Sequence, residues 1–340
     1  MNELRFGIIG TGFWARYQLA AWRELSGARC VALCNRTRAK ADALAREFDL
    51  PAVYEDAEEM LRREKPDFVD IITDVDTHSR FVHLAAAHKT PVICQKPMAP
   101  SAAMAEKMIA ACTAGSVPFS IHENWRWQTP IRELKRVLDS GVIGPVFRAR
   151  IDYCNSFPVF DNQPLLKTLE QFIMADMGSH IFDVARFLFG EAARMYCQTH
   201  RITSGIAGED AATAMLRMRS GATVVCNLSY ASRVEHDCFP QTFVHIEGAR
   251  GAVELGPDYW LRVTTERGTE TRRVPPPVYS WADPRYALVH SSIVECHRNL
   301  LHALQTGTAP ETSAADNLKT LQLVEAAYDS ARGVETVEVG

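Results

Sequence analysis

A short apolar strand that runs into a glycine turn and then into a helix limits the fold of this chain more than any other feature. The strand is Leu4–Ile9, the turn is Gly10-Thr11-Gly12, and an amphipathic helix follows over about residues 13–25. The same alternation continues with predicted strands at 30–33, 68–72 and 92–94 and predicted helices at 38–48, 78–88 and 101–114. Strands joined by helices of this length need right-handed crossovers, so the N-terminal third is predicted to form a parallel sheet.

The pattern changes near residue 119. After a helix predicted at 130–140, closely spaced strands are predicted at 146–153, 212–218, 222–230, 242–247, 252–255 and 259–264, and two helices follow at 289–305 and 314–331. Short strands separated by glycine-containing turns are typical of an antiparallel sheet. The predicted fold class is therefore α/β. Residues 1–121 are expected to form a parallel α/β domain, and residues 122–340 a second α/β domain with a large, mostly antiparallel open sheet.

Composition excludes several functional classes. The chain has 340 residues, 47% of them hydrophobic and 23% charged, which is ordinary for a globular protein and sufficient for two domains. A formal net charge of −4 gives no reason to expect nucleic acid as a partner. The N-terminus lacks the order of a signal peptide, and no apolar run is long enough to span a bilayer. The nine cysteines are scattered without a C-x-x-C pair, which favours reduced thiols in a cytoplasmic protein.

The glycine turn is the first candidate site. Gly10-x-Gly12-x-x-Ala15 closes a strand and opens a helix at the start of a βαβ series, which is the context that dinucleotide binding requires. Gly10 would allow the tight turn, Gly12 would let the backbone approach a pyrophosphate, and Ala15 would let the helix pack closely on the strand. The pattern predicts a Rossmann domain that binds NAD or NADP.

The end of the second strand bears on which dinucleotide binds. An acidic residue here usually bonds the ribose 2′-hydroxyl of NAD and repels the 2′-phosphate of NADP. This chain has Asn35 and Arg36 instead. Asn35 can bond a hydroxyl, and Arg36 can stack on adenine, pair with a phosphate or simply be solvated. We expect a slight preference for NAD, with NADP left open.

A second candidate site lies in DMGSHIFD, residues 176–183. If the segment is helical from residue 177, then Asp176, His180 and Asp183 share one face at spacings of four and three. A carboxylate beside an imidazole fixes its tautomer and supports proton transfer, so the stripe predicts a general base. No H-E-x-x-H pattern or cysteine cluster accompanies it, so no metal site is predicted.

Four segments together resemble the glucose–fructose oxidoreductase, inositol dehydrogenase and rhizopine-catabolism (Gfo/Idh/MocA) family. They are GIIGTGFWA at residues 7–15, VICQKPMA at 92–99, ENWRWQTPIRELKRVLDSGVIG at 123–144 and DMGSHIFD at 176–183. The C-terminal ETSAADNLKTLQLVEAAYDSAR is similar to the family's closing helix. The resemblance covers essentially the whole chain and implies hydride transfer between a nicotinamide and a sugar-like carbinol.

The resemblance also implies roles for individual residues. Lys96 matches the lysine of the family's E-K-P motif, with a cis bond to Pro97 expected, while Gln95 departs from that motif's glutamate. His180 would be the catalytic base, and Asp176 would orient it or bind a neighbouring hydroxyl. The residues expected at the cofactor are Gly10, Gly12, Phe13, Trp14, Asn35, Arg36, Thr73, His78, Gln95, Lys96 and Asn124. Those expected at the substrate are Trp125, Arg126, Asp161, Lys167, Asp176 and His180.

Substrate and assembly are less constrained. The tryptophans beside Arg126 can stack on a sugar ring or simply pack the domain junction. The combination weakly resembles pentose dehydrogenases of the family, D-apiose dehydrogenases included. Two alternatives remain: an isomerase, lyase or glycosidase that recycles its NAD internally, and a non-catalytic sugar-sensing regulator. Apolar residues on both faces of the strand at 222–230 predict a homodimer or homotetramer formed through the C-terminal sheet.

Overall fold

The computed structural model describes residues 3–339 and divides them between two compact units. The first unit comprises residues 1–124, 279–283 and 290–321, and the second comprises 125–278, 284–289 and 322–340. The change at 124/125 lies close to the expected boundary at 121. The return of 279–283 and 290–321 to the first unit departs from the expected single block at 122–340, because these C-terminal segments pack on the N-terminal sheet.

The first unit is built on a six-stranded parallel sheet with the order β3-β2-β1-β4-β5-β6. Its strands are β1 (Leu4–Ile9), β2 (Ala28–Cys34), β3 (Val53–Tyr54), β4 (Phe68–Ile71), β5 (Val92–Gln95) and β6 (Phe119–His122). Its helices in the N-terminal segment are α1 (Phe13–Arg23), α2 (Arg38–Glu47), α3 (Ala57–Glu64), α4 (Val75–Ala87) and α5 (Ala102–Ala114). The strand order reverses between β1 and β4, which is the position where open parallel sheets bind ligands.

Helix α9 (Ala287–Thr306) contributes to the core of this unit from far along the sequence. The ring of His297 stacks on Trp22 with centroids 3.9 Å apart, and the indole Nε1 of Trp22 donates to Asp70 on β4 at 2.9 Å. All three side chains are buried. The last helix, α10 (Ala314–Gly333), begins in the first unit and ends in the second.

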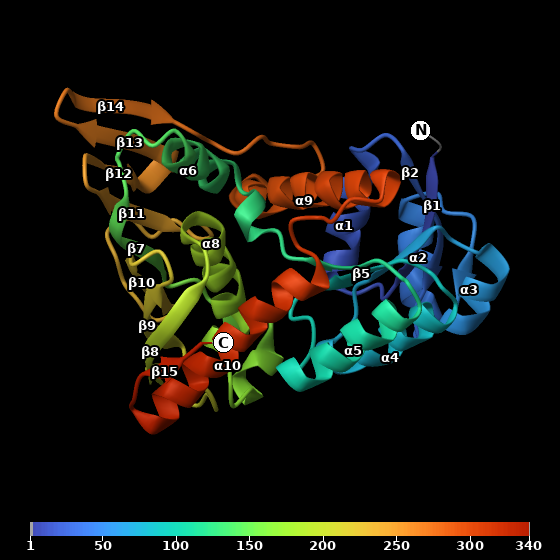
Figure 1. Ribbon diagram of the computed structural model, residues 1–340. Helices are drawn as coiled ribbons and strands as arrows, with labels where there is room; N and C mark the ends of the chain where they lie inside the picture. Colours follow the sequence, from blue (N-terminus) through green and yellow to red (C-terminus); the bar gives the residue numbers. More distant parts are fainter. Residues whose placement is uncertain (1–2, 340) are drawn as a thin grey trace. The chain divides into compact units, whose positions relative to one another are not determined.

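The second unit is built on a nine-stranded sheet with the order β14-β13-β12-β11-β7-β10-β9-β8-β15 (Figure 1). Its strands are β7 (Val146–Cys154), β8 (Ala192–His200), β9 (Ala211–Met218), β10 (Thr223–Ser229), β11 (Phe243–Gly248), β12 (Gly251–Leu255), β13 (Trp260–Thr265), β14 (Gly268–Arg273) and β15 (Val337–Glu338). Among the described residues only β7 and β10 pair in parallel, so the sheet is mixed and mostly antiparallel, as the turn spacing predicts.

Helical segments of the second unit supply the remaining core and the second candidate site. The helices are α6 (Thr129–Asp139), α7 (Val159–Asn162) and α8 (Ser179–Phe189), and a π-helical turn, η3 (Met174–Gly178), leads directly into α8. The short 3-10 turns are η1 (Trp125–Trp127), η2 (Pro164–Thr168), η4 (Pro257–Tyr259) and η5 (Pro284–Tyr286). Helix α8 packs on β7 and β10, and Val224, Cys226 and Leu228 of β10 are buried beneath the helical layer.

The outer face of this sheet is more polar than the sequence pattern suggests. Of the apolar run 224–226, only Val225 faces outward. Asp152 accepts from Arg150 and from the amide of Asn227, both at 2.7 Å, and Thr213 donates to the other end of that amide at 2.9 Å. Polar pairs on β7, β9 and β10 therefore lie on the same face of the sheet as Val225.

None of the nine cysteines, which all lie within the described range, forms a disulfide. Among residues 3–339 no three His, Cys, Asp or Glu side chains gather as a metal site would require. The same residues contain no helix that is both long and apolar enough to span a membrane.

Candidate functional site

The turn between β1 and α1 has the properties of a phosphate-binding turn. Gly10 has φ +103°, and a Cβ there would lie 2.3 Å from the Ile72 carbonyl oxygen, so no other residue fits. A Cβ on Gly12 would meet nothing within 4 Å, which leaves open space beside the start of the helix. The first turn of α1 has no side-chain cap and no acidic residue. The helix dipole and the N–H groups at the start of α1 can therefore receive an anion.

Thr11 adds a second sign that this turn receives a polar ligand. Its hydroxyl oxygen is buried and has no hydrogen-bond partner among residues 3–339. Buried polar atoms are rarely left without a partner, so such an atom beside an open glycine turn fits a dinucleotide pyrophosphate. Phe13 and Trp14, which follow the turn, are 71% and 38% exposed and therefore remain accessible to a bound cofactor.

The loops after β4 and β5 are held together by a buried histidine. The Nδ1 atom of His78 lies 3.0 Å from the Pro97 carbonyl oxygen, and its Nε2 atom lies 3.0 Å from that of Thr73. Burial lowers the pKa of His78. The ring thus braces the turn that carries Lys96 and Pro97, whose peptide bond is cis as expected. A direct contact between His78 and the cofactor is not needed to explain its position.

Other predicted cofactor residues also make local contacts. The amide oxygen of Gln95 accepts from the backbone N–H of Lys96 at 3.1 Å, and Lys96 itself is half-buried. The amide nitrogen of Asn124 donates to the Ser292 hydroxyl on α9 at 2.8 Å. Arg36 is exposed. Gln95 therefore stabilises the Lys96 turn without the negative charge that the family's glutamate would bring.

In the second unit, His180 lies in the first turn of α8 and stacks on Trp125. The ring centroids are 4.2 Å apart and the planes are 22° from parallel. The Trp125 indole donates to the Thr242 hydroxyl at 3.3 Å, and this hydrogen bond fixes the orientation of the indole ring that stacks on the imidazole. Both aromatic side chains are buried. Trp125 thus orients the predicted base, a role that sugar stacking alone would not have suggested.

The predicted stripe of Asp176, His180 and Asp183 spans two kinds of helical turn. Asp176 lies in the π-helical turn η3, whereas His180 and Asp183 lie in α8. Asp183 instead holds Arg126 through two hydrogen bonds, from Nε at 2.8 Å and from Nη2 at 2.6 Å. Both partners are buried. This ion pair accounts for the burial of Arg126, which was predicted to bind substrate, without a substrate.

Asp176 lies near a pair of tyrosines that sequence reasoning did not identify. Burial raises the pKa of Tyr153 on β7 and of Tyr230, and the negative charge of Asp176 adds to both increases. The two phenol oxygens are 3.5 Å apart, and the Tyr153 ring meets Trp125 edge-on. Tyr153 occupies an inward-facing position of β7. The alternation of residues along this strand was the sequence signal that could have identified it. Asp161 in α7 and Lys167 in η2 are both exposed.

Glu209 was also missed, and no local motif marks it. Its buried carboxylate accepts from the backbone N–H groups of Phe172 at 3.2 Å and Met174 at 3.1 Å, and from the Tyr328 hydroxyl at 2.6 Å. The N–H of Ala175 donates to that hydroxyl at 3.0 Å. Glu209 and Tyr328 therefore anchor the start of η3, the segment that carries Asp176.

Comparison with known proteins identifies the family of the chain. Residues 4–122 match the model of an oxidoreductase family with an NAD-binding Rossmann fold, and residues 131–254 match the GFO/IDH/MocA C-terminal domain. The chain belongs to the Gfo/Idh/MocA family of oxidoreductases. Its first unit is thus the NAD-binding Rossmann domain of that family, and the second contains the family's C-terminal domain.

Relatives within the Gfo/Idh/MocA family cover the full chain. A D-apiose dehydrogenase of Paraburkholderia graminis is 44% identical over 100% of this chain and 90% of its own length. A D-apiose dehydrogenase of Rhizobium rhizogenes is 40% identical over 100% of this chain and 99% of its own length. A solved oxidoreductase from Agrobacterium radiobacter, in complex with NAD+, L-tartaric acid and magnesium, superposes with a TM-score of 0.98 at 40% identity, over 100% of this chain and 99% of that one.

Proposed function

We propose that this chain is an NAD-dependent dehydrogenase of a D-apiose-like aldose, which it oxidises at the anomeric carbon. The observation that carries the proposal is the full-length identity of 44% and 40% to two D-apiose dehydrogenases. A cyclic aldose would lose hydride from the anomeric C–H and a proton from the anomeric hydroxyl, which gives a lactone. The cofactor, when bound, supplies the hydride acceptor.

The residues of the chain supply position and proton transfer. Gly10, Thr11 and Gly12 would hold the pyrophosphate, and His78 would keep the Lys96 turn in place. His180, oriented by the Trp125 ring, would accept the proton of the reacting hydroxyl. Lys96 would donate a hydrogen bond to the same oxygen and stabilise the negative charge that develops on it.

Asp176 and the tyrosine pair would bind the remaining hydroxyls of the sugar. Asp176 lies near Tyr153 and Tyr230, so an acceptor and two hydroxyl groups meet at one place, which suits a polyhydroxylated ligand. Asp161 and Lys167 are exposed in the segment 159–168 and remain candidates for further contacts. Slight preference for NAD over NADP is part of the proposal.

A sugar panel with the purified protein tests this function. D-apiose, D-xylose, myo-inositol and a glucose control would be offered with NAD+ and, in parallel, with NADP+, while absorbance of the reduced cofactor is followed. We expect NADH to accumulate fastest with D-apiose. Sugar conversion without free NADH would instead support internally recycled NAD, and tight sugar binding without conversion would support a sensor.

A further inference from the structure

The residue that should read the adenosine ribose is already engaged elsewhere. Oδ1 of Asn35 accepts from the Thr11 N–H at 3.4 Å, and its Nδ2 donates to the Thr37 carbonyl at 3.0 Å. Both ends of this amide therefore hold the backbone around the glycine turn. An amide committed at both ends is poorly placed to distinguish a ribose 2′-hydroxyl from a 2′-phosphate, so the discriminating group must be sought nearby.

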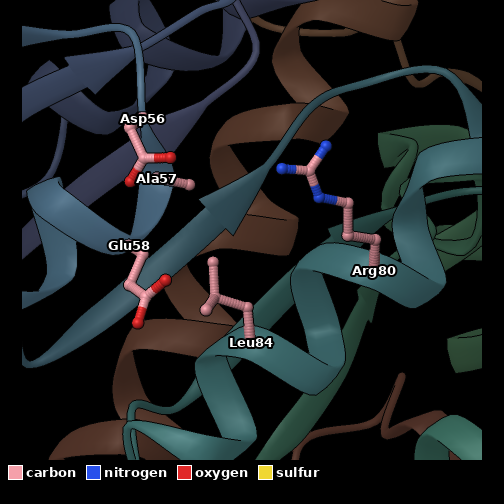
Figure 2. A pocket seen from close by; sticks show the side chains of 5 residues that line it. All are labelled: Asp56, Ala57, Glu58, Arg80 and Leu84. Carbon is pink, nitrogen blue, oxygen red and sulfur yellow. The ribbon is translucent and has the colours of Figure 1, made fainter.

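A pocket of about 240 Å³ lies between the start of α3 and helix α4, and Figure 2 shows the side chains that line it. They are Asp56, Ala57, Glu58, Arg80 and Leu84. Pockets that enclose whole ligands occupy roughly 300–1,000 Å³, so this one suits the end of an extended ligand. Two carboxylates and one guanidinium on the lining give it a net charge of about −1, which disfavours an added phosphate.

The pocket is next to the end of β2. The N–H of Asn35 donates to the Tyr54 carbonyl at 3.0 Å, and Asp56 follows Tyr54 by two residues. Burial raises the pKa of the Cys34 thiol to about 12, with Asp56 adding to the increase and Arg80 opposing it. Both charges therefore lie close to the last residue of the strand, where the adenosine ribose of a Rossmann cofactor is read.

Asp56 and Arg80 in this pocket can each form a further interaction with a ligand. One carboxylate oxygen of Asp56 accepts from the Glu59 N–H at 2.7 Å, and the other has no hydrogen bond to any residue in the described range 3–339. Arg80 forms no ion pair within that range, and its guanidinium extends across the pocket toward the side of Asp56 (Figure 2). The pocket thus offers a carboxylate oxygen of Asp56 as an acceptor and Arg80 as a cation, with the Glu58 carboxylate also on its lining.

We propose that Asp56 is the residue that makes this enzyme prefer NAD to NADP, by accepting a hydrogen bond from the adenosine ribose and repelling a 2′-phosphate. This inference rests on the proposed function. Arg80, on the opposite side, attracts a phosphate and thereby limits the preference to a modest one. The acid expected at the end of β2 is in this reading supplied by the first residue before α3.

Substitution of Asp56 by asparagine tests the inference cleanly. Asparagine caps a helix as well as aspartate does, so Asp56→Asn removes the charge and keeps the start of α3. Calorimetric titrations would use AMP and adenosine 2′,5′-bisphosphate, then NAD+ and NADP+. We expect the affinity for the two 2′-phosphorylated ligands to rise about tenfold relative to their partners, as one removed charge a few ångströms away allows. Arg80→Met should lower that affinity.

Two controls separate a local contact from a general charge effect. Glu55→Gln removes an exposed charge next in sequence but outside the pocket lining, and Asp56→Ser provides a second uncharged cap. Unchanged selectivity in both Asp56 variants, or an equal shift in Glu55→Gln, overturns this inference alone. A wild-type chain that binds neither dinucleotide overturns the proposed function and this inference with it.

Discussion

Single side chains in the second unit show how the imidazole of the predicted base, His180, is held. His180 is buried against Trp125, whose indole is tied to Thr242. Arg126, the next residue, is held by Asp183 one turn further along α8. The segment after residue 124 therefore supplies both a flat support for the base and an anchor for the helix that carries it. A base fixed in this way loses little freedom when the substrate binds.

The first prediction concerns His180 and Lys96. His180→Ala should lower kcat by about 10²- to 10⁴-fold, because general-base catalysis is lost, while the dissociation constant for NAD stays nearly unchanged. Lys96→Ala should lower kcat by a similar factor, because a donor to the developing oxyanion is lost. The double variant should be far less impaired than the product of the two losses, since both groups act on one hydroxyl.

Steady-state rates and NAD titrations measure these effects, and His302→Ala, at an exposed position on α9, is the matched control. Near-normal turnover of His180→Ala at pH 7 would mean that another group is the base. Asp176 would then be tested next.

The second prediction concerns the buried pair Asp70 and His297, whose nearest side-chain atoms are 4.0 Å apart. Burial raises the pKa of Asp70 from 3.8 to about 7, and burial and His122 lower the pKa of His297 well below 6.5. Between about pH 4 and 6.5 the unfolded pair carries its one proton on the histidine and the folded pair carries it on the aspartate. The proton number is the same, so this pair adds no pH dependence to stability there.

Removing either partner should make the unfolding free energy depend on pH, because the remaining group then titrates differently in the folded and unfolded states. In His297→Gln the unfolding free energy should fall as pH rises from 4 to 7, by about 4 kcal/mol, because only the folded state keeps Asp70 protonated. In Asp70→Asn it should fall as pH drops below 6.5, because only the unfolded state then protonates His297. Urea unfolding at several pH values measures both slopes. Parallel curves for the three proteins would contradict the prediction.

At the scale of secondary structure, the π-helical turn η3 carries Asp176 and leads directly into α8. The N–H groups of Phe172 and Met174 donate to one buried carboxylate, Glu209, and the N–H of Ala175 donates to the hydroxyl of Tyr328. The conformation of this segment therefore depends on Glu209, which lies more than thirty positions away. Substitution of Glu209 should affect the candidate site by moving the backbone of η3.

The third prediction follows from that anchor. Glu209→Ala should lower the unfolding free energy by about 2–3 kcal/mol, because buried N–H groups lose a charged acceptor. It should also raise KM for the sugar while NAD affinity stays unchanged, since the cofactor turn lies in the other unit. Tyr328→Phe, which removes one hydroxyl and keeps the ring, should lower the unfolding free energy less and raise KM less than Glu209→Ala. Equal KM values for wild type and Glu209→Ala would argue against an anchoring role.

Secondary structure could be predicted from the sequence where hydrophobic periodicity marks it. It could not be predicted where contacts between residues far apart in the sequence determine the local structure. Most strands of the two sheets and the long helices were located to within a few residues. The strands β3, β6, β8, β14 and β15 and the helices α3 and α7 were missed. Helix α3, which Asp56 precedes, escaped notice because its charged segment AEEMLRRE buries only Ala57, Met60 and Leu61. The stripe of residues 176–183 assumed one continuous α-helix. Glu209 lies far from that stripe in sequence and only the fold places it beneath η3.

At the scale of the whole molecule, the outer face of the nine-stranded sheet is the surface that bears on assembly. Tyr196, Met215 and Val225 align across β8, β9 and β10, and Met215 is 48% exposed. This apolar row is narrow, and the polar pairs around Asp152 border it. A sheet face of this mixed kind can meet a second copy of itself around a two-fold axis.

The fourth prediction is therefore a homodimer or homotetramer formed through this face. Light scattering at micromolar concentration should give a mass at least twice that of the 37.9 kDa chain. Met215→Lys should shift the equilibrium toward the monomer, because it places a charge within the apolar row, whereas Thr269→Lys on the exposed strand β14 should not. A stable wild-type monomer would contradict the prediction.

The return of α9 to the N-terminal unit has a consequence for synthesis on the ribosome. Residues 1–124 contain all six strands of the parallel sheet, yet Trp22 and Asp70 are covered by His297. Residues 125–296 must be translated in between, which takes on the order of 10–30 seconds at about 5–20 residues per second. During that interval the nascent chain lacks the helix that buries Trp22 and Asp70 in the folded protein. We expect a chaperone to bind this surface until α9 emerges from the ribosome.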